Sequence, residues 1–330
     1  ISSAESGVKY FILGALSSGI LLYGFSLIYG FTGSMNFDDI SFYLSKYDNL
    51  NLGLIFGLVF VMVGLAFKVS AVPFHMWTPD VYEGAPTTVT AFFASAPKVA
   101  ALAMLGRFLF DAFESEFKDW QQILIFLSFL SMFLGSIAAI IQTNIKRLMA
   151  FSSISHMGFA LMGLAAGSEV GLNALLIYSF LYVIMNIGVF TFIINMRKDG
   201  VSITEISSLN LFVKIDPLRS FFLSLLILSL AGIPPLVGFL GKVYVFSAAI
   251  DAGLFWLAGA GAISSVIGAF YYIRIVYLIY FGKQSDPLTG KMPKFHWIVF
   301  SLSSIAVILG TFNLLGIQSF ADLASTSLMQ

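Results

Sequence analysis

Long apolar stretches separated by short polar connections dominate the chain. A helix needs about 20 mostly apolar residues to cross a bilayer, and nine segments reach or approach that length. They are residues 7–30, 51–70, 87–110, 121–142, 146–166, 171–196, 217–250, 254–281 and 296–317. The pattern predicts an all-α polytopic membrane protein with about nine transmembrane helices, forming a single membrane domain over residues 1–330.

The composition supports this assignment. Of 330 residues, 58% are hydrophobic and 10% are charged, whereas a soluble domain carries about 25% charged residues. The chain has no cysteine and only three histidines, His75, His156 and His296. Without cysteine it has no iron–sulfur or thiolate metal ligands, and three histidines do not supply paired axial ligands for two haems. We therefore expect neither a metal nor a redox cofactor in this chain.

The charges in the connections indicate an orientation. On one side of the predicted bundle the connections carry most of the basic residues, namely Lys9, Lys146, Arg147, Arg197, Lys198, Lys214, Arg219, Lys283, Lys291 and Lys294. The other side has only Lys46 and Lys118 among mostly acidic residues. Because basic connections stay on the cytoplasmic side, we expect the basic face to be cytoplasmic (or matrix) and the C-terminus to lie opposite. Small residues recur in the first and eighth segments, at 14–19 and 259–262, and predict close helix packing there.

Two lysines interrupt the apolar sequence between residues 57 and 106. Lys98 lies near the middle of its segment, where a charge costs about 2.5–3.5 kcal/mol on insertion scales, and the adjacent Pro97 removes a backbone hydrogen bond. We predict a functional role for Lys98. Lys68 lies at the end of its apolar run, so the spacing fits an interfacial lysine and a functional one equally. The proline-rich break at 73–86 favours a functional role, because non-helical backbone within the membrane must line a cavity or be buried in protein.

The seventh segment carries a third lysine beside a second proline break. Pro234 and Pro235 cannot donate hydrogen bonds to the carbonyls of Leu230 and Ala231, so the segment predicts a discontinuous helix whose freed carbonyls are polar groups inside the membrane. Lys242 comes just after this break and lies roughly 12 Å from the acidic end at Asp251, so it cannot easily reach water. A functional role is predicted for Lys242 as well.

Three other polar residues have two interpretations each. His156, flanked by serines within the fifth segment, is either a relay between lysines or a satisfied core residue. His75 and Asp80 lie in the first break and either mark the mouth where protons enter from the basic face or cap the broken helix ends. Buried amines suit a proton path because burial disfavours their charged form, so that a neighbouring charge decides whether the proton stays.

Four stretches occur in the order and spacing of a known family: FKVSAVPFHMWTPDVYEGAP, APKVAAL, QTNIKRLMAFSSISHMGF and SLAGIPPLVGFLGKVYVF. They resemble the antiporter-like membrane subunits of respiratory complex I, the proton-pumping NADH:quinone oxidoreductase, over residues 1 to about 300. The lysine at the seventh-segment break favours one branch of that family, because several sister subunits and cation/proton antiporters carry glutamate there.

The resemblance implies an inverted-repeat, antiporter-like fold in which each repeat has one broken helix, here around Lys68–Asp80 and Leu230–Lys242. Residues 7–110 would be the remainder of the first repeat, residues 121–281 the second repeat and residues 296–317 a C-terminal helix. The chain begins at Ile1 with a short polar stretch, and we expect it to lack the first helices of a longer protein, including the buried glutamate of the family, which Glu5 does not replace.

The resemblance further implies proton transfer through Lys68, Lys98, Lys242 and His156, driven by quinone reduction elsewhere in a complex that uses NADH, FMN, iron–sulfur clusters and quinone. Its partners would be other membrane-arm subunits, including sister antiporter-like subunits, with no nucleic acid. The membrane would be the bacterial inner (plasma) membrane, or the mitochondrial inner membrane. The alternatives are a stand-alone cation/proton antiporter and a purely structural anchor.

Overall fold

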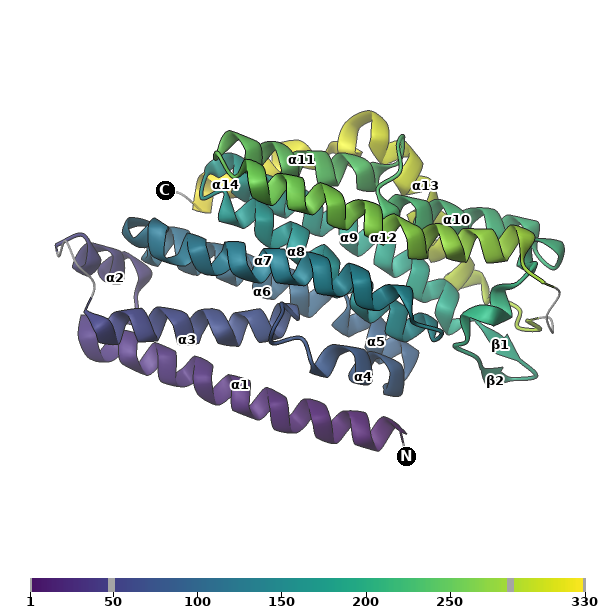
Figure 1. The fold of residues 1–330 in the computed structure, drawn as a ribbon, viewed down its shortest axis with the longest axis horizontal. Helices are drawn as coiled ribbons and strands as arrows, with labels where there is room; N and C mark the ends of the chain where they lie inside the picture. Colours follow the sequence, from purple (N-terminus) through teal and green to yellow (C-terminus); the bar gives the residue numbers. More distant parts are fainter. Residues whose placement is uncertain (1, 47–50, 284–287, 329–330) are drawn as a thin grey trace.

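A computed structural model describes residues 2–46, 51–283 and 288–328, and it is almost entirely helical (Figure 1). The helices are α1 (Ser2–Thr32), α2 (Phe37–Leu44), α3 (Leu52–Val69), α4 (Trp77–Gly84), α5 (Thr87–Phe93), α6 (Ala96–Arg107), α7 (Phe117–Ile140), α8 (Ile145–Ala165), α9 (Glu169–Ile194), α10 (Pro217–Ala231), α11 (Val237–Asp251), α12 (Phe255–Phe281), α13 (Lys294–Asn313) and α14 (Ile317–Leu328). Two short strands, β1 (Arg197–Lys198) and β2 (Val201–Ser202), form a hairpin. Within these described residues, eight helices are long and apolar enough to cross a membrane.

The nine predicted segments all correspond to helices, which confirms the polytopic all-α class. Eight of them overlap the eight candidate spans, and the seventh, 217–250, is the pair of half-helices α10 and α11. The long helices run roughly parallel or antiparallel to one another (Figure 1). The helices therefore lie where the apolar segments of the sequence predicted them.

Helix α8 is the centre of the bundle. It is buried along almost its whole length and contacts α4, α7, α9 and α11. Close approach to α7 depends on Gly135 and Gly158, because a Cβ at either position would lie within 3.0 Å of backbone atoms of the facing helix. The prediction that small residues in the first and eighth segments mediate packing is wrong for Gly14, Gly19 and Gly259, where a Cβ would meet nothing within 4 Å.

The first proline break lies between α3 and α4. Helix α3 ends at Val69, and Ser70 adopts the left-handed conformation with φ 66°. The broken helix is stabilised by two side chains: Trp77 Nε1 donates to the carbonyl of Phe67 at 3.0 Å, and the Val72 N–H donates to Ser131 Oγ at 2.9 Å. Both α3 and α4 lie along α1 (Figure 1).

The predicted helix 87–110 is divided into α5 and α6. Ser95, between them, has φ −122° and ψ −86°, which are not helical angles, and Pro97 lies in the first turn of α6. Pro97 contributes to this division, because it has no N–H to donate to the carbonyl of Phe93, four residues earlier, and its ring clashes with that carbonyl in a continuous helix. The segment then ends in a π-helical turn, Phe108–Ala112.

Two amphipathic helices at the acidic face are absent from the sequence prediction. Helix α2 begins at the Asn36 cap, whose side chain accepts from the Asp38 N–H. Helix α14 follows α13, which ends at Asn313 rather than near 317, and Thr326 Oγ1 donates to Glu169 at the start of α9 at 2.8 Å. Both are short and carry polar residues, aspartates in α2 and serines in α14, so their mean hydropathy does not identify them.

Candidate proton path

Lys98 lies in the first turn of α6, and its side chain is 1% exposed. Its Nζ donates to Ser153 Oγ of α8 at 2.5 Å, and the Tyr182 hydroxyl of α9 donates to the same oxygen at 2.6 Å. The ammonium also lies 5.5 Å from the centroid of the Tyr82 ring. In the described part of the chain no carboxylate pairs with Lys98, so this amine is buried with one hydroxyl for its three donor positions.

Lys242 is in the second turn of α11 and is 5% exposed. Its Nζ donates to the carbonyl of Ala231, at the end of α10, and to Ser265 Oγ of α12, both at 2.8 Å. The Ala231 carbonyl is one of the two predicted to be freed by the proline break. The lysine therefore uses a polar group that the discontinuous helix exposes.

His156 lies between these lysines on α8 and is 4% exposed. Its Nδ1 is 2.6 Å from the Tyr178 hydroxyl and its Nε2 is 3.0 Å from the Tyr272 hydroxyl, which also bonds to Ser152 Oγ. The ring of Tyr182 packs on the imidazole with centroids 5.2 Å apart. We call the following group the polar seam: Lys98, Ser152, Ser153, His156, Tyr178, Tyr182, Lys242, Ser265 and Tyr272.

Lys68 is partly exposed near the end of α3, and within the described residues it has no hydrogen-bond or ion-pair partner. Helices α1 and α3 pack antiparallel, with Gly24 against Val61 and Leu21 against Gly64. Continuing this register brings Lys68 level with Ser17, in the middle of α1 (Ser2–Thr32). The depth of Lys68 therefore favours the functional interpretation of this residue over the interfacial one.

Asp80 is part of an ion-pair network at the basic face, outside the helices long enough to span. Its two carboxylate oxygens contact Arg147 Nη1 at 2.7 Å and Lys9 Nζ at 2.9 Å. Arg147 also pairs with Glu83 at 2.9 Å, so that the network joins α1, α4 and α8. The hydrogen bond from Lys9, together with the Arg147 guanidinium, holds the pKa of the Asp80 carboxyl below its usual range.

His75 lies in the loop before α4 and is partly exposed, with a buried Nδ1 that has no hydrogen-bond partner in the described residues. The N-terminus of α4, at Met76, has no side-chain cap. The capping interpretation of His75 and Asp80 therefore has no hydrogen bond to support it there. Their interpretation as the place where protons enter stays a prediction.

Comparison with known proteins decides the family. A family model described as NADH:quinone oxidoreductase/Mrp antiporter, TM, matches residues 1–268. The chain belongs to this family. The prediction drawn from the four sequence stretches is thereby confirmed.

Its relatives carry a more specific name. The chain is 54% identical over 327 residues to NADH-quinone oxidoreductase subunit N of Rhodobacter capsulatus, which covers 99% of this chain and 68% of the relative. It is 56% identical over 336 residues to the protein of the same name from Jannaschia sp. (strain CCS1), covering 100% of this chain and 69% of the relative. Together with the eight candidate spans, this similarity makes the chain a multi-pass bacterial membrane protein.

Solved structures show the same fold. A chain of respiratory complex I from Thermus thermophilus with bound aureothin matches with a TM-score of 0.80 and 29% identity, covering 96% of this chain and 68% of that one. A chain of the Mrp complex from Dietzia sp. matches with a TM-score of 0.87 and 21% identity, covering 100% and 69%, which shows the antiporter-like fold alone. Both neighbours come from multi-subunit assemblies.

The tyrosines of the polar seam and Lys146 were missed by the sequence analysis. Tyr178 and Tyr182 are spaced four residues apart on α9, a signal that was available, but tyrosine is also common at membrane interfaces. Lys146 was assigned to a basic connection, whereas it is 4% exposed and donates to the carbonyls of Glu83 at 2.7 Å and Ala85 at 2.6 Å.

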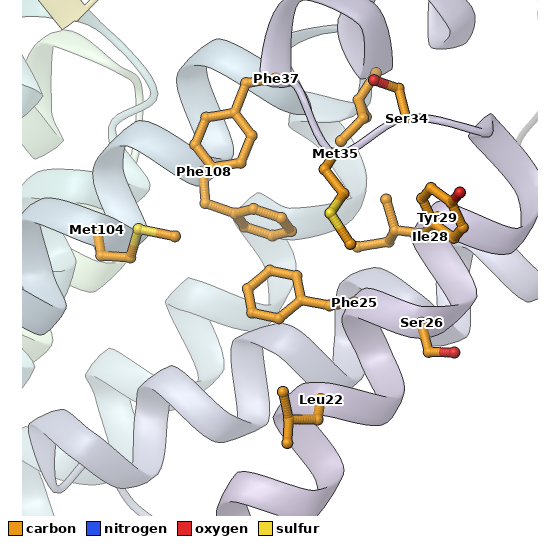
Figure 2. Close-up of a pocket in the computed structure, with 11 residues that line it drawn as sticks. Leu22, Phe25, Ser26, Ile28, Tyr29, Ser34, Met35, Phe37, Met104 and Phe108 are labelled. Carbon is orange, nitrogen blue, oxygen red and sulfur yellow. The ribbon is translucent and has the colours of Figure 1, made fainter.

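An apolar cavity of about 520 Å³ lies apart from the polar seam, between α1, α2 and the π-helical turn (Figure 2). Figure 2 shows Phe25 and Phe108 next to each other at this cavity, with Met35 beside them, and the two rings pack edge to face with centroids 6.1 Å apart. None of the predicted proton-transfer residues lines it. Among the described residues, no group of three or more His, Cys, Asp or Glu side chains could hold a metal ion.

Proposed function

We propose that this chain is the subunit N component of a bacterial proton-translocating NADH:quinone oxidoreductase, and that its polar seam carries protons. The observation that supports the path is the burial of two amines, Lys98 and Lys242, on either side of His156. A charge at the middle of a membrane helix costs about 2.5–3.5 kcal/mol. A purely structural anchor would gain stability from an apolar residue at each of these positions.

The contacts of the two amines suit reversible protonation. Each makes hydrogen bonds to neutral groups only, a serine hydroxyl for Lys98, and a serine hydroxyl and a carbonyl for Lys242. A hydroxyl or a carbonyl stabilises a charged amine less than a carboxylate would. A change in the charge nearby can therefore shift the protonation equilibrium of each lysine. Lys68, level with the middle of α1, would be the third amine of the path, and His156 the relay between Lys98 and Lys242.

The energy would come from partner subunits. In this proposal NADH, FMN, iron–sulfur clusters and quinone are bound by other chains of the complex, and sister antiporter-like subunits adjoin this chain in the membrane arm. Quinone reduction would then alter the conformation or electrostatics of the seam. We also propose the division into residues 7–110, 121–281 and 296–317, since a left-handed residue, Ser70 or Gly232, begins each of the two breaks.

Replacement of Lys98 by Ala in the full-length subunit, within the intact complex, tests the proposal. We expect proton pumping to be lost while the peripheral arm still oxidises NADH with an artificial acceptor. The matched control is Lys118→Ala, which removes an exposed lysine at the acidic face and leaves pumping unchanged. Pumping that survives in Lys98→Ala would overturn the assignment of this path.

Stand-alone cation/proton antiport is the competing function. Reconstitution of the full-length subunit without partners distinguishes the two, because an antiporter exchanges sodium for protons on its own. Sodium-dependent proton movement in such vesicles would favour antiport. Its absence, together with pumping by the intact complex, is the result that our proposal expects.

A further inference from the structure

A second buried group of hydroxyls lies where α7, α8 and α12 meet. Ser136 Oγ of α7 is 3.0 Å from Ser155 Oγ of α8 and 3.0 Å from Ser264 Oγ of α12. Ser264 also donates to the Met132 carbonyl of α7 at 2.8 Å. The three serines are between 0% and 3% exposed. We call Ser136, Ser155 and Ser264 the serine clamp, because their hydrogen bonds join three helices.

The serine clamp satisfies its own hydrogen bonds. When Ser264 donates to the Met132 carbonyl, it can accept from Ser136. Ser136 can in turn accept from Ser155, so that every hydroxyl hydrogen has an acceptor. Within the described residues none of the three serines bonds to a lysine, a histidine or a carboxylate. The contacts of the clamp therefore suit it to holding helices together.

The clamp lies next to the polar seam on α12. Ser264 directly precedes Ser265, whose hydroxyl accepts from Lys242 Nζ at 2.8 Å. Two turns further along α12, the Tyr272 hydroxyl is 3.0 Å from Nε2 of His156. Successive residues of a helix point about 100° apart, so Ser264 bonds to α7 while Ser265 bonds to α11. A movement of α12 away from α7 would therefore change both contacts with the seam.

A second hydrogen bond joins α12 to α7 beyond these seam residues. Arg274 Nη1 donates at 2.9 Å to the carbonyl of Ile140, the last residue of α7. The seam residues of α12 thus lie between Ser264 and Arg274, the two points at which it bonds to α7. Helix α12 packs mainly on α7 and α10 and little on α8. Because apolar side chains give helices little tendency to associate in a bilayer, interhelical hydrogen bonds and close packing determine where α12 lies.

We propose that Ser264 is a positioning residue, which holds α12 against α7 so that Ser265 reaches Lys242. Through the same helix it places the Tyr272 hydroxyl at His156. The inference rests on the proposed proton path, because both of these contacts belong to the polar seam. Loss of the Ser264 hydroxyl would change the position of α12 and thereby slow proton transfer, although every group of the seam is still present.

Ser264→Ala tests the proposal, and Ser128→Ala is its matched control. Ser128 of α7 is also 0% exposed and also donates at 2.8 Å to a carbonyl of a facing helix, that of Gly158 on α8. It forms no hydrogen bond to α12 in the part of the chain that the structure describes. We expect similarly small falls in thermal midpoint for the two variants. Ser264→Ala should still fold, since the Arg274 bond to α7 remains.

Electron paramagnetic resonance measures the position of α12. Spin labels on cysteines introduced at Val266 of α12 and Leu302 of α13, both exposed, report the distance between these helices in the full-length subunit in lipid nanodiscs. We expect a broader distance distribution in Ser264→Ala and an unchanged one in Ser128→Ala. The same distribution in the wild-type protein and Ser264→Ala would overturn the positioning role, whatever the pumping experiments on Lys98 show.

Proton pumping by the intact complex tests the link between α12 and the path. We expect the number of protons pumped per NADH oxidised to fall severalfold in Ser264→Ala and to stay the same in Ser128→Ala. NADH oxidation with an artificial acceptor should be unchanged in both. Weaker assembly alone would lower the amount of complex without changing this ratio. A broader distance distribution with full pumping per NADH would overturn the link, and so would an equal fall in the two variants.

Discussion

The Lys242 ammonium donates a 2.8 Å hydrogen bond to the Ala231 carbonyl, across the break between α10 and α11. In a continuous helix this carbonyl would accept from the residue four positions later, but that residue is Pro235, which has no N–H. The amine takes the place of the missing donor. The carbonyl that the break leaves free and the buried ammonium are therefore hydrogen-bond partners of each other.

Gly232→Ala is predicted to disturb this arrangement. Gly232 has φ +80°, and a Cβ there would lie 2.8–3.1 Å from the outer atoms of the Lys242 side chain. Gly253→Ala is a matched control, because Gly253 has φ +76° and no neighbour within 4 Å of the added Cβ. We expect both variants to lose roughly 1–2 kcal/mol of stability from the left-handed backbone, seen as lower thermal midpoints. Only Gly232→Ala should also lose proton pumping. Equal pumping by the two variants would mean that the added Cβ does not disturb Lys242.

The transmembrane segments could be predicted from sequence because length and mean hydropathy are local properties. The break at Pro234 and Pro235 could be predicted for the same reason, since a proline's missing donor depends on no other part of the chain. The split of α5 from α6 at Ser95 was anticipated only as a loosened helix beside Pro97. Helices α2 and α14 were missed because packing at the acidic face, and not hydropathy, stabilises them.

The sequence predicts those site residues whose burial in a membrane is energetically costly. Lysines within apolar segments stand out, and the structure buries both Lys98 and Lys242. Their partners could not be predicted: Ser153 lies 55 residues from Lys98 and is one of many serines. The contact depends on how α6, which packs on α3 and α9, is placed within reach of α8, a long-range relationship that no local pattern encodes.

Ser153→Ala is predicted to impair the path at Lys98. The variant removes the one hydroxyl that accepts from both the Lys98 ammonium and the Tyr182 hydroxyl. Leaving a buried charged donor unpaired costs about 1.5–3 kcal/mol, so we expect a lower thermal midpoint and slower proton pumping. Ser304→Ala is the control, because Ser304 is equally buried but bonds to backbone carbonyls away from the seam. Equal pumping by both serine variants would count against a role for Ser153.

Lys146→Met is predicted to loosen α4 without touching the polar seam. The Lys146 ammonium donates to the carbonyls of Glu83 and Ala85, where α4 ends, and a cation is favourable at a helix C-terminus. Methionine keeps the length of the side chain but leaves these carbonyls without their donor, at a cost of about 1–3 kcal/mol. We expect less assembled complex in membranes and a lower thermal midpoint, with Lys118→Met at an exposed site as the control. An unchanged midpoint in Lys146→Met would show that the contact contributes nothing.

Asp80→Asn is predicted to lower stability in a pH-dependent way. Lys9 and Arg147 hold the pKa of the Asp80 carboxyl below its usual value of about 3.9, so the folded protein favours the ionised form. The stabilisation is therefore fully present above about pH 4 and is lost as the pH falls through the lower folded-state pKa. Thermal midpoints of the two proteins should differ at pH 7, stay equally different down to pH 5, and converge below pH 4, where the protonated aspartic acid resembles asparagine.

Salt provides the second measurement for the same network. The side chains of Asp80, Arg147 and Lys9 are 35%, 33% and 43% exposed, so dissolved ions screen their attraction, with a Debye length of about 3 Å at 1 M. The difference between the wild-type protein and Asp80→Asn at pH 7 should therefore shrink at high salt. Asp119→Asn removes an exposed carboxylate that has no ion pair in the described residues. Its thermal midpoint should equal that of the wild-type protein at low and at high salt. A difference between wild type and Asp80→Asn that is as large at pH 3 as at pH 7, and unaffected by salt, would mean that Asp80 acts through packing and not through its charge.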